Sequence, residues 1–170
     1  MPATTQSTAR DFFLSTVKPT VDEFLGDTLD VRRGRLAAIV LHHMADHAAI
    51  DGYSGKEMQK RVRALHKDLI DVCPDFALIC DIADASKHAR LHVREDKPRQ
   101  VSTAEQITML PGLFHAPFGE GVFREASCVI VRLESGMIRP LETPVRLVLR
   151  MWEEILFPGP IQLAKPGTPL

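Results

Sequence analysis

The chain has 170 residues, of which 45% are hydrophobic and 25% are charged, a balance typical of ordinary globular proteins. A chain of this length can bury one substantial core, so we expect a single domain over residues 10–157. Residues 1–9 and 158–170 are polar or rich in proline, and they are expected to form flexible tails. The formal net charge of -1 gives no bulk electrostatic reason to expect nucleic acid or an anionic membrane as a partner.

Neither the start of the chain nor its cysteines predict export. The first residues lack a basic start followed by a long apolar core, so no signal peptide is expected. No apolar run approaches the ~20 residues that a membrane-spanning helix needs. Cys73, Cys80 and Cys128 show no C-x-x-C spacing, which argues against a disulfide framework or a thiolate zinc site. Cys73 and Cys80 lie among apolar residues and are expected to fill the core, and the reducing cytoplasm is the expected location.

The first half of the chain has the periodicity of helices. The apolar residues that follow Arg10 predict a helix that Pro19 breaks or kinks. A second helix is expected from the N-cap Asp30 to about Ile50. Its predicted buried stripe recurs every three to four residues and comprises Leu36, Val40, His43, His47 and Ile50. A third helix is expected to begin at a capping box over residues 54–57, in which Tyr53 and Met58 form a hydrophobic staple.

The remaining elements include a change of period. A fourth helix is predicted from Pro74 to about Leu91. Residues 127–133 are rich in β-branched side chains and predict a strand, which a turn at 134–136 joins to residues 137–139 as a hairpin. Residues 143–157 predict a last amphipathic helix that contains Trp152. The expected fold class is therefore α+β and mainly helical: a bundle of about five helices with a small antiparallel hairpin or sheet inserted before the last helix.

Two histidines of the second helix are the first candidates for chemistry. His43 and His47 are four residues apart and are expected to face inward, where they can ligate one divalent metal ion if a second helix adds ligands. The alternative is that both are core histidines hydrogen-bonded to buried oxygens. His42 and Asp46 form a second such pair, which is assigned to the solvent-facing side of the helix.

The fourth helix carries a polar stripe of Asp81, Asp84, His88 and His92 opposite its apolar residues. The stripe is either the solvated face of the helix or, if both faces are covered, the wall of a cleft. In the second case Asp84 facing His43 or His47 predicts a His/Asp divalent site with a metal-bound water as nucleophile. Lys87 is then a candidate to stabilise a developing negative charge.

Arg61 and His66 suggest a different activity. An arginine followed by a histidine one or two turns later resembles the arrangement in the small helical ribonucleases of the HEPN type, in which both side chains attend the scissile phosphate. The chain departs from that pattern by having Val62 directly after the arginine, and Arg35 with His42 matches the same loose spacing. The alternative is that the basic residues around Arg61 form an ordinary solvated helix face.

Three functions remain open from the sequence. The leading hypothesis is a protein that binds a divalent metal ion, or is a metal-dependent hydrolase, using His43, His47, Asp84 and His88. The second is a non-enzymatic interaction module that contacts a protein partner or a second copy through the loop 110–119 or through the Trp152 helix. The third is a ribonuclease that uses Arg61 and His66. The metal hypothesis implies a small-molecule substrate, whose identity the sequence does not give.

Overall fold

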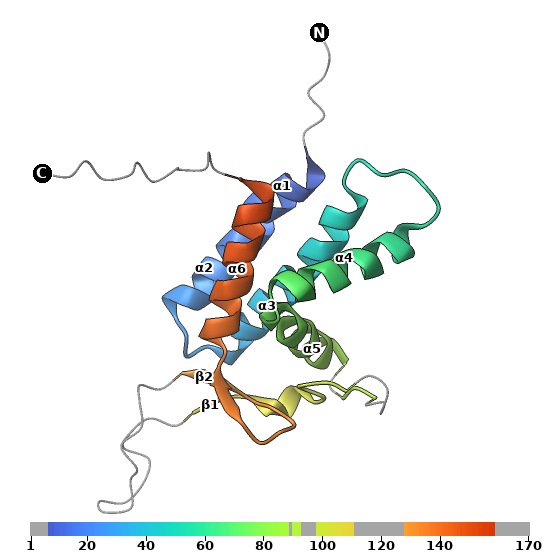
Figure 1. Cartoon of the computed structure of the whole chain (residues 1–170). Coiled ribbons are helices and arrows are strands. Elements are labelled where there is room, and N and C mark those ends of the chain that lie inside the picture. Colours follow the sequence, from blue (N-terminus) through green and yellow to red (C-terminus); the bar gives the residue numbers. More distant parts are fainter. Residues whose placement is uncertain (1–6, 89, 93–97, 111–127, 159–170) are drawn as a thin grey trace, which may run out of the picture.

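The structure is a computed structural model that describes residues 7–88, 90–92, 98–110 and 128–158. It is a mainly helical α+β fold with a three-stranded antiparallel sheet before the last helix, as the sequence predicts (Figure 1). Residues 1–6, 159–170 and most of the loop 110–119 lie outside the described residues, so the expectations for these segments stay untested. The described domain begins earlier than expected, because Ala9 is already buried in a helix.

The described part of the chain starts with three helical segments that follow one another without a break. They are α1 (Thr8–Phe12), the π-helical turn η1 (Phe13–Val17) and α2 (Lys18–Gly26). Pro19 lies in the first turn of α2, where its missing amide proton is tolerated best. The helix therefore does not break at this proline; the π-helical turn η1 comes directly before α2 instead. The buried Phe13 and Phe24 hold this rod against the rest of the core.

The long helix α3 (Val31–Ile50) contacts each of the other helical layers. The side chain of Asp30 caps it by accepting a hydrogen bond from the Arg33 amide at 3.0 Å. The stripe predicted to be buried is wrong, because Leu36 and Ile50 are 39% and 36% exposed. The buried face is instead rich in small residues, which let neighbouring helices approach closely: Gly34, Ala37, Ala38, Leu41, Met44, Ala45 and Ala49.

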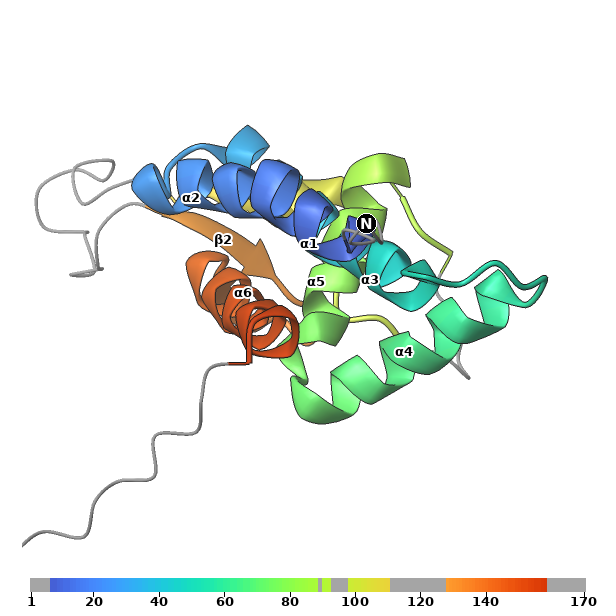
Figure 2. The same cartoon turned by 90° about the horizontal axis from the view of Figure 1, so that it is seen from above.

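The next two helices form the side of the molecule that carries the cleft described below. Helix α4 (Met58–Val72) lies at the edge, and α5 (Asp75–His88) packs against α3, α4 and α6 (Figure 2). The predicted capping box is wrong, because α4 begins at Met58 with Glu57 as N-cap and no side-chain cap. The Glu57 amide donates instead to the hydroxyl of Tyr53 at 3.4 Å, and this side-chain contact joins the two ends of the turn before α4.

The sheet has the order β1 (Ile107–Met109), β2 (Val129–Arg132) and β3 (Ile138–Pro140), and the 3-10 turn η2 (Ala104–Gln106) precedes it. The predicted hairpin is confirmed as β2 and β3, with Arg132 paired to Ile138. Gly136 adopts a φ of 82°, a backbone conformation that favours glycine in this turn. The pairing of β1 with β2 was not predicted, since residues 100–109 carry no clear alternation.

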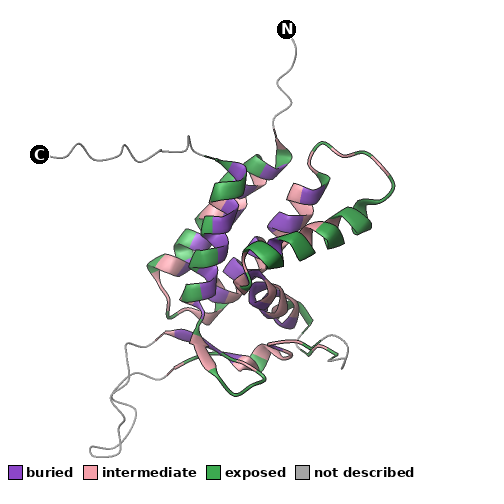
Figure 3. Ribbon diagram, viewed as in Figure 1, coloured by how far each residue is buried: buried purple, intermediate pink, exposed green. Residues whose placement is uncertain are grey.

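The last helix, α6 (Glu142–Leu156), closes the core. Trp152 is fully buried, and its Nε1 donates to the carbonyl of Leu41 on α3 at 3.2 Å. Buried and exposed residues alternate along α6, as expected for an amphipathic helix with one side on the core (Figure 3). No helix among the described residues has both the length and the apolar character needed to cross a bilayer.

Candidate metal centre

A cleft of about 610 Å³ opens between α4 and α5. Residues of α4 line one side of the cleft, and residues of α5 line the other. His42 of α3 and the segment that begins at Pro98 complete the lining. The charged and polar residues that line it are His42, Arg63, His66, Lys67, Asp71, Cys80, Asp81, Asp84, Arg99 and Gln100. Polar groups from three helices therefore meet in a space large enough for a small molecule.

Three potential metal ligands converge in this cleft, one from each helix. The ligand atoms of His42, His66 and Cys80 all lie within 4.8 Å of one another. The Nδ1 atom of His66 is 4.0 Å from the Sγ atom of Cys80. The rings of His42 and His66 meet edge to face, with their centroids 5.2 Å apart. Among the described residues, no other group of three or more His, Cys, Asp or Glu side chains comes this close together.

The packing of α3 determines which histidine reaches the cleft. His42 follows Ala38 by four residues and precedes Ala45 by three, so it lies on the face where small side chains bring α3 close to α5. Its side chain is 15% exposed, whereas that of its neighbour His43 is 43% exposed. His66 is positioned by Phe76 of α5, whose ring meets its own edge to face at 5.4 Å.

Burial sets the protonation of the two ligand types. Burial, together with the positive charge of Lys87, lowers the pKa of His42 to about 4, so its imidazole is neutral near pH 7. A neutral imidazole is the form that coordinates a metal ion. Burial and the nearby Asp84 carboxylate raise the pKa of the Cys80 thiol to about 12. A metal ion at this site must therefore displace a proton from Cys80 when it binds.

Asp84 forms a second layer behind His42. Its Oδ1 atom is 3.9 Å from Nδ1 of His42 and 3.5 Å from Nζ of Lys87. Its Oδ2 atom accepts a hydrogen bond from Arg99 at 3.2 Å. The same guanidinium donates to Asp81 at 2.9 Å, so Arg99 ties two carboxylates of α5 together.

Asp81 anchors the segment that borders the cleft mouth. Its Oδ2 atom accepts from the amide of Gln100 at 2.7 Å, and its side chain is 14% exposed. Burial raises its pKa, and the Gln100 hydrogen bond and the Arg99 charge offset only part of that effect. Asp81 and Asp84 therefore line a cleft, whereas His88, which the sequence placed on the same polar stripe, is exposed and does not line it.

The structure separates the four predicted metal ligands. The inward orientation predicted for His43 is wrong, because its side chain is 43% exposed and pairs with Asp46 at 3.3 Å. His47 is partly buried and stacks on Phe12, with ring centroids 3.7 Å apart. His88 is exposed at the end of α5. The solvent assignment of His42 is also wrong, and both errors follow from the rotated buried face of α3. Asp84 alone of the four lines the cleft.

The residues of the ribonuclease hypothesis also lie apart. Arg61 donates through Nε to the carbonyl of Ala49 at 3.0 Å, and its guanidinium lies over the ring of Tyr53 at 4.4 Å. It lines a separate hollow on the other side of α4, whereas His66 lines the cleft. Lys87 lies beside His42, with Nζ 3.5 Å from Nδ1, and the role predicted for this lysine stays a prediction.

Three residues of the site were not predicted: His42, Cys80 and Arg99. The alanines spaced around His42 were a usable signal, because small residues at helical spacing mark a close helix contact. Cys80 gave no signal, since a cysteine among apolar residues is usually core filler. Arg99 lies outside any regular element, and its contact with α5 spans residues 81 to 99.

No protein-family model, no curated protein and no solved structure matches this chain. The functional argument therefore depends on the geometry and chemistry of the cleft.

Proposed function

We propose that the protein binds one divalent transition-metal ion, with zinc preferred, through His42, His66 and Cys80, and uses it to hydrolyse a small-molecule substrate. The observation that carries this proposal is the convergence of the three ligand atoms within 4.8 Å at an open cleft. The ligands come from three helices that are far apart in sequence, so the folded core holds them in place. Cys73 and Cys80 form no disulfide, which is in keeping with the cytoplasmic location that we propose.

The ligand set favours zinc. Two imidazoles and one thiolate are the nitrogen and sulfur donors that zinc takes in proteins, at roughly 2.0 to 2.3 Å from the ion. Tetrahedral geometry at those bond lengths separates the donor atoms by roughly 3.3 to 3.8 Å. The observed limit of 4.8 Å is wider, so side-chain rotation must bring the ligands somewhat closer together.

Three protein ligands leave a fourth position for water or substrate, as in catalytic zinc sites. A metal ion there lowers the pKa of a bound water to about 7 and so supplies a nucleophile. If Nε2 of His42 faced the metal ion, Nδ1 would point toward Asp84 and Lys87, whose Oδ1 and Nζ atoms lie 3.9 and 3.5 Å from it, so these two charges would flank the ligand ring. Arg99 fixes Asp84, and Lys87 offers a positive charge beside the site for the developing oxyanion.

Metal binding is tested on tag-free protein that has been stripped with a chelator and reloaded. We expect about one zinc ion per chain by elemental analysis. Cobalt substitution is expected to give a thiolate-to-cobalt absorption band that Cys80→Ser removes and Cys73→Ser leaves intact. His42→Ala and His66→Ala are expected to weaken binding about 10- to 100-fold or more, whereas the neighbouring His43→Ala is the matched control without effect.

Substoichiometric metal in the reloaded protein, or a cobalt band unchanged by Cys80→Ser, overturns the metal centre. Hydrolysis is tested separately with activated carboxylic and phosphoric esters. Turnover is expected to stop with the chelator, to return with zinc, and to fail in Cys80→Ser. Stoichiometric zinc without turnover of any such ester leaves the metal centre standing and contradicts the hydrolytic role.

A further inference from the structure

The α4 side of the cleft carries a row of charged residues at its rim. The residues of α4 that line the cleft form two rows, each with a spacing of four residues. The inner row is Val62, His66 and Ile70, and the outer row is Arg63, Lys67 and Asp71. The inner row is apolar apart from the proposed metal ligand, whereas every residue of the outer row is charged and exposed. A line of charge therefore lies beside the candidate metal centre.

Two cations of the outer row are not neutralised by any acidic residue of the described part of the chain. Arg63 donates a hydrogen bond to the amide oxygen of Gln59 at 3.3 Å, and neither it nor Lys67 forms an ion pair there. The two are four residues apart, a spacing at which like charges repel and destabilise a helix. By contrast, Lys60 of the same helix contacts Glu57 at 3.5 Å. Arg63 and Lys67 are therefore placed to receive an anion from outside the chain.

The acidic residues of the cleft leave these two cations available. Asp81 and Asp84 on the opposite wall both pair with Arg99, at 2.9 and 3.2 Å. Asp71 is the one acid of the outer row and lies two turns, about 12 Å along the helix axis, from Arg63. The rim thus carries a net positive charge, which is greatest at its Arg63 end.

Helical spacing places both cations next to the metal ligand of α4. Arg63 precedes His66 by three residues, so the Cβ atoms of the two lie roughly 5 to 6 Å apart. Lys67 directly follows His66, and its side chain lines the same cleft. A group held at the open position of the metal centre is therefore within reach of both long side chains.

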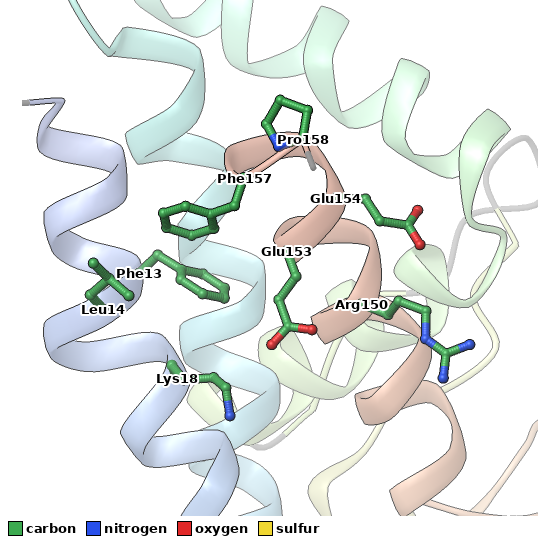
Figure 4. A pocket seen from close by; sticks show the side chains of 8 residues that line it. All are labelled: Phe13, Leu14, Lys18, Arg150, Glu153, Glu154, Phe157 and Pro158. Carbon is green, nitrogen blue, oxygen red and sulfur yellow. The ribbon is translucent and has the colours of Figure 1, made fainter. Parts of the chain in front are cut away.

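A second hollow, of about 520 Å³, lies between η1 and α6 and lacks this combination (Figure 4). Phe13, Leu14 and Phe157 make it mainly apolar, and its lysine, Lys18, pairs with Asp22 on its own helix. No three potential metal ligands converge there among the residues that the structure describes. Of these two hollows, the cleft between α4 and α5 is the one that places unpaired cations beside potential metal ligands.

We propose that the substrate of the cleft is a phosphate monoester, whose phosphoryl group lies between the metal centre and the two cations Arg63 and Lys67. This substrate class rests on the metal-dependent hydrolysis proposed above. Two cations match a phosphate monoester, which carries nearly two negative charges near pH 7, better than a carboxylate, which carries one. Val62 and Ile70 of the inner row are apolar and suit the organic part of the ester.

The reaction is the hydrolysis of the ester bond. A water molecule attacks the phosphorus atom, the bond between phosphorus and the alcohol oxygen breaks, and the alcohol oxygen takes up the proton that the water gives off. The products are an alcohol and inorganic phosphate, so no oxidant, reductant or further reactant takes part. Arg63 and Lys67 stabilise the negative charge on the phosphoryl oxygens in the transition state, as cationic side chains do in phosphoryl transfer.

The first test is the binding of inorganic phosphate to the full chain by isothermal titration calorimetry. The zinc-reloaded protein, freed of excess zinc, is expected to bind phosphate. The double variant Arg63→Ala/Lys67→Ala is expected to bind it about 10- to 100-fold more weakly, because charge-assisted hydrogen bonds are lost. Lys60→Ala is the matched control without effect, since Lys60 lies on the same helix outside the cleft. All three positions are exposed, so circular dichroism is expected to show folded variants.

Acetate is the second probe, and it is expected to bind about tenfold more weakly than phosphate or less tightly still. Acetate that binds as tightly as phosphate overturns the substrate class, and so does phosphate binding that the double variant leaves unchanged. Stoichiometric zinc without phosphate binding contradicts this substrate class alone. A chain that takes up no zinc, yet binds phosphate through Arg63 and Lys67, contradicts the metal centre and supports the cation pair as a phosphate site.

Turnover is then compared for 4-nitrophenyl phosphate and the uncharged ester 4-nitrophenyl acetate. The zinc-loaded protein is expected to prefer the phosphate ester. The double variant is expected to lower kcat/KM for this ester about 10- to 100-fold and to leave that for the acetate ester within about twofold. Equal losses for both esters, or a preference for the acetate ester, overturn the substrate class. A zinc-loaded chain that hydrolyses neither ester contradicts the hydrolysis and the substrate class together.

Discussion

Two regions of the molecule meet on α3, the apolar core around Trp152 and the polar cleft around His42. Leu41 belongs to the apolar core, where its carbonyl accepts the indole hydrogen bond of Trp152. His42, the next residue, serves the second region and faces Cys80 and His66. Apolar burial stabilises the core without any demand on hydrogen bonding beyond the indole, whereas the cleft keeps several charged groups half-buried.

The difference shows where the fold gains stability and where it holds chemistry. In the core, Trp152 packs edge to face against Phe76 of α5 with ring centroids 6.3 Å apart. In the cleft, the carboxylates of the same helix need Arg99 to offset their burial. We therefore expect substitutions in the core to act mainly on folding, and substitutions in the cleft to act mainly on pH dependence and on metal affinity.

The largest expected effect is on the core side. Trp152→Ala removes a fully buried aromatic ring and its hydrogen bond, and it is expected to lower the free energy of unfolding by about 3 to 5 kcal/mol. Urea denaturation followed by circular dichroism measures the loss. Phe157→Ala, on the exposed end of the same helix, is the control and is expected to cost well under half as much. Equal losses at the two positions would contradict the assignment of the core to Trp152.

The second effect is a pH dependence that originates in the cleft. The pKa of His42 falls from the ordinary 6.5 to about 4 on folding, so the unfolded chain binds the proton more tightly. Its contribution to stability is therefore fully present above pH 6.5 and is lost as the pH falls toward 4. The titratable groups that act on it are Lys87, Asp84, His66 and Asp46.

His42→Gln is expected to flatten the stability profile of the metal-free protein over this interval by roughly 2 to 3 kcal/mol. Denaturation curves at half-unit pH steps measure the profile. His43→Gln, next to it on α3 but exposed, is expected to leave the slope as it was. A slope that persists in His42→Gln would show that another group carries the titration.

Arg99→Ala is expected to have a moderate effect. It leaves Asp81 and Asp84, which are 14% and 26% exposed, without their shared cation. The expected loss is about 1 to 3 kcal/mol at pH 7, and it is expected to shrink at acidic pH because protonated carboxyls no longer need the cation. Arg146→Ala breaks an exposed pair and serves as the control, with an expected loss below about 0.5 kcal/mol. Equal losses for both arginines would indicate that the cleft pairs are as solvated as the surface pair.

The smallest effect is expected at His43, which is a metal ligand in the sequence-based hypothesis but not in the site that we propose from the structure. His43→Ala removes a side chain that is 43% exposed and is expected to change stability by less than about 0.5 kcal/mol. Zinc content of the reloaded variant is expected to equal that of the unsubstituted protein. A loss of zinc in His43→Ala with retention in His42→Ala would reverse the ligand assignment on α3.

The sequence by itself determined the elements whose signals are local. Pro74 and Asp75 correctly placed the start of α5, the turn at 134–136 correctly predicted the hairpin, and the amphipathic spacing around Trp152 correctly predicted α6. Hydrophobic periodicity and turn chemistry act over a few residues, so one chain is enough to show them. The α+β class followed from these elements.

Only the tertiary structure decided which face of α3 is buried. Bulky Leu36 and Ile50 suggested one face, but the alanines and Gly34 form the buried one, because close helix packing favours small side chains. This rotation moved the inward position from His43 to His42. It also brought His42 to within reach of His66 and Cys80, whose meeting depends on the packing of three helices rather than on any spacing along the chain.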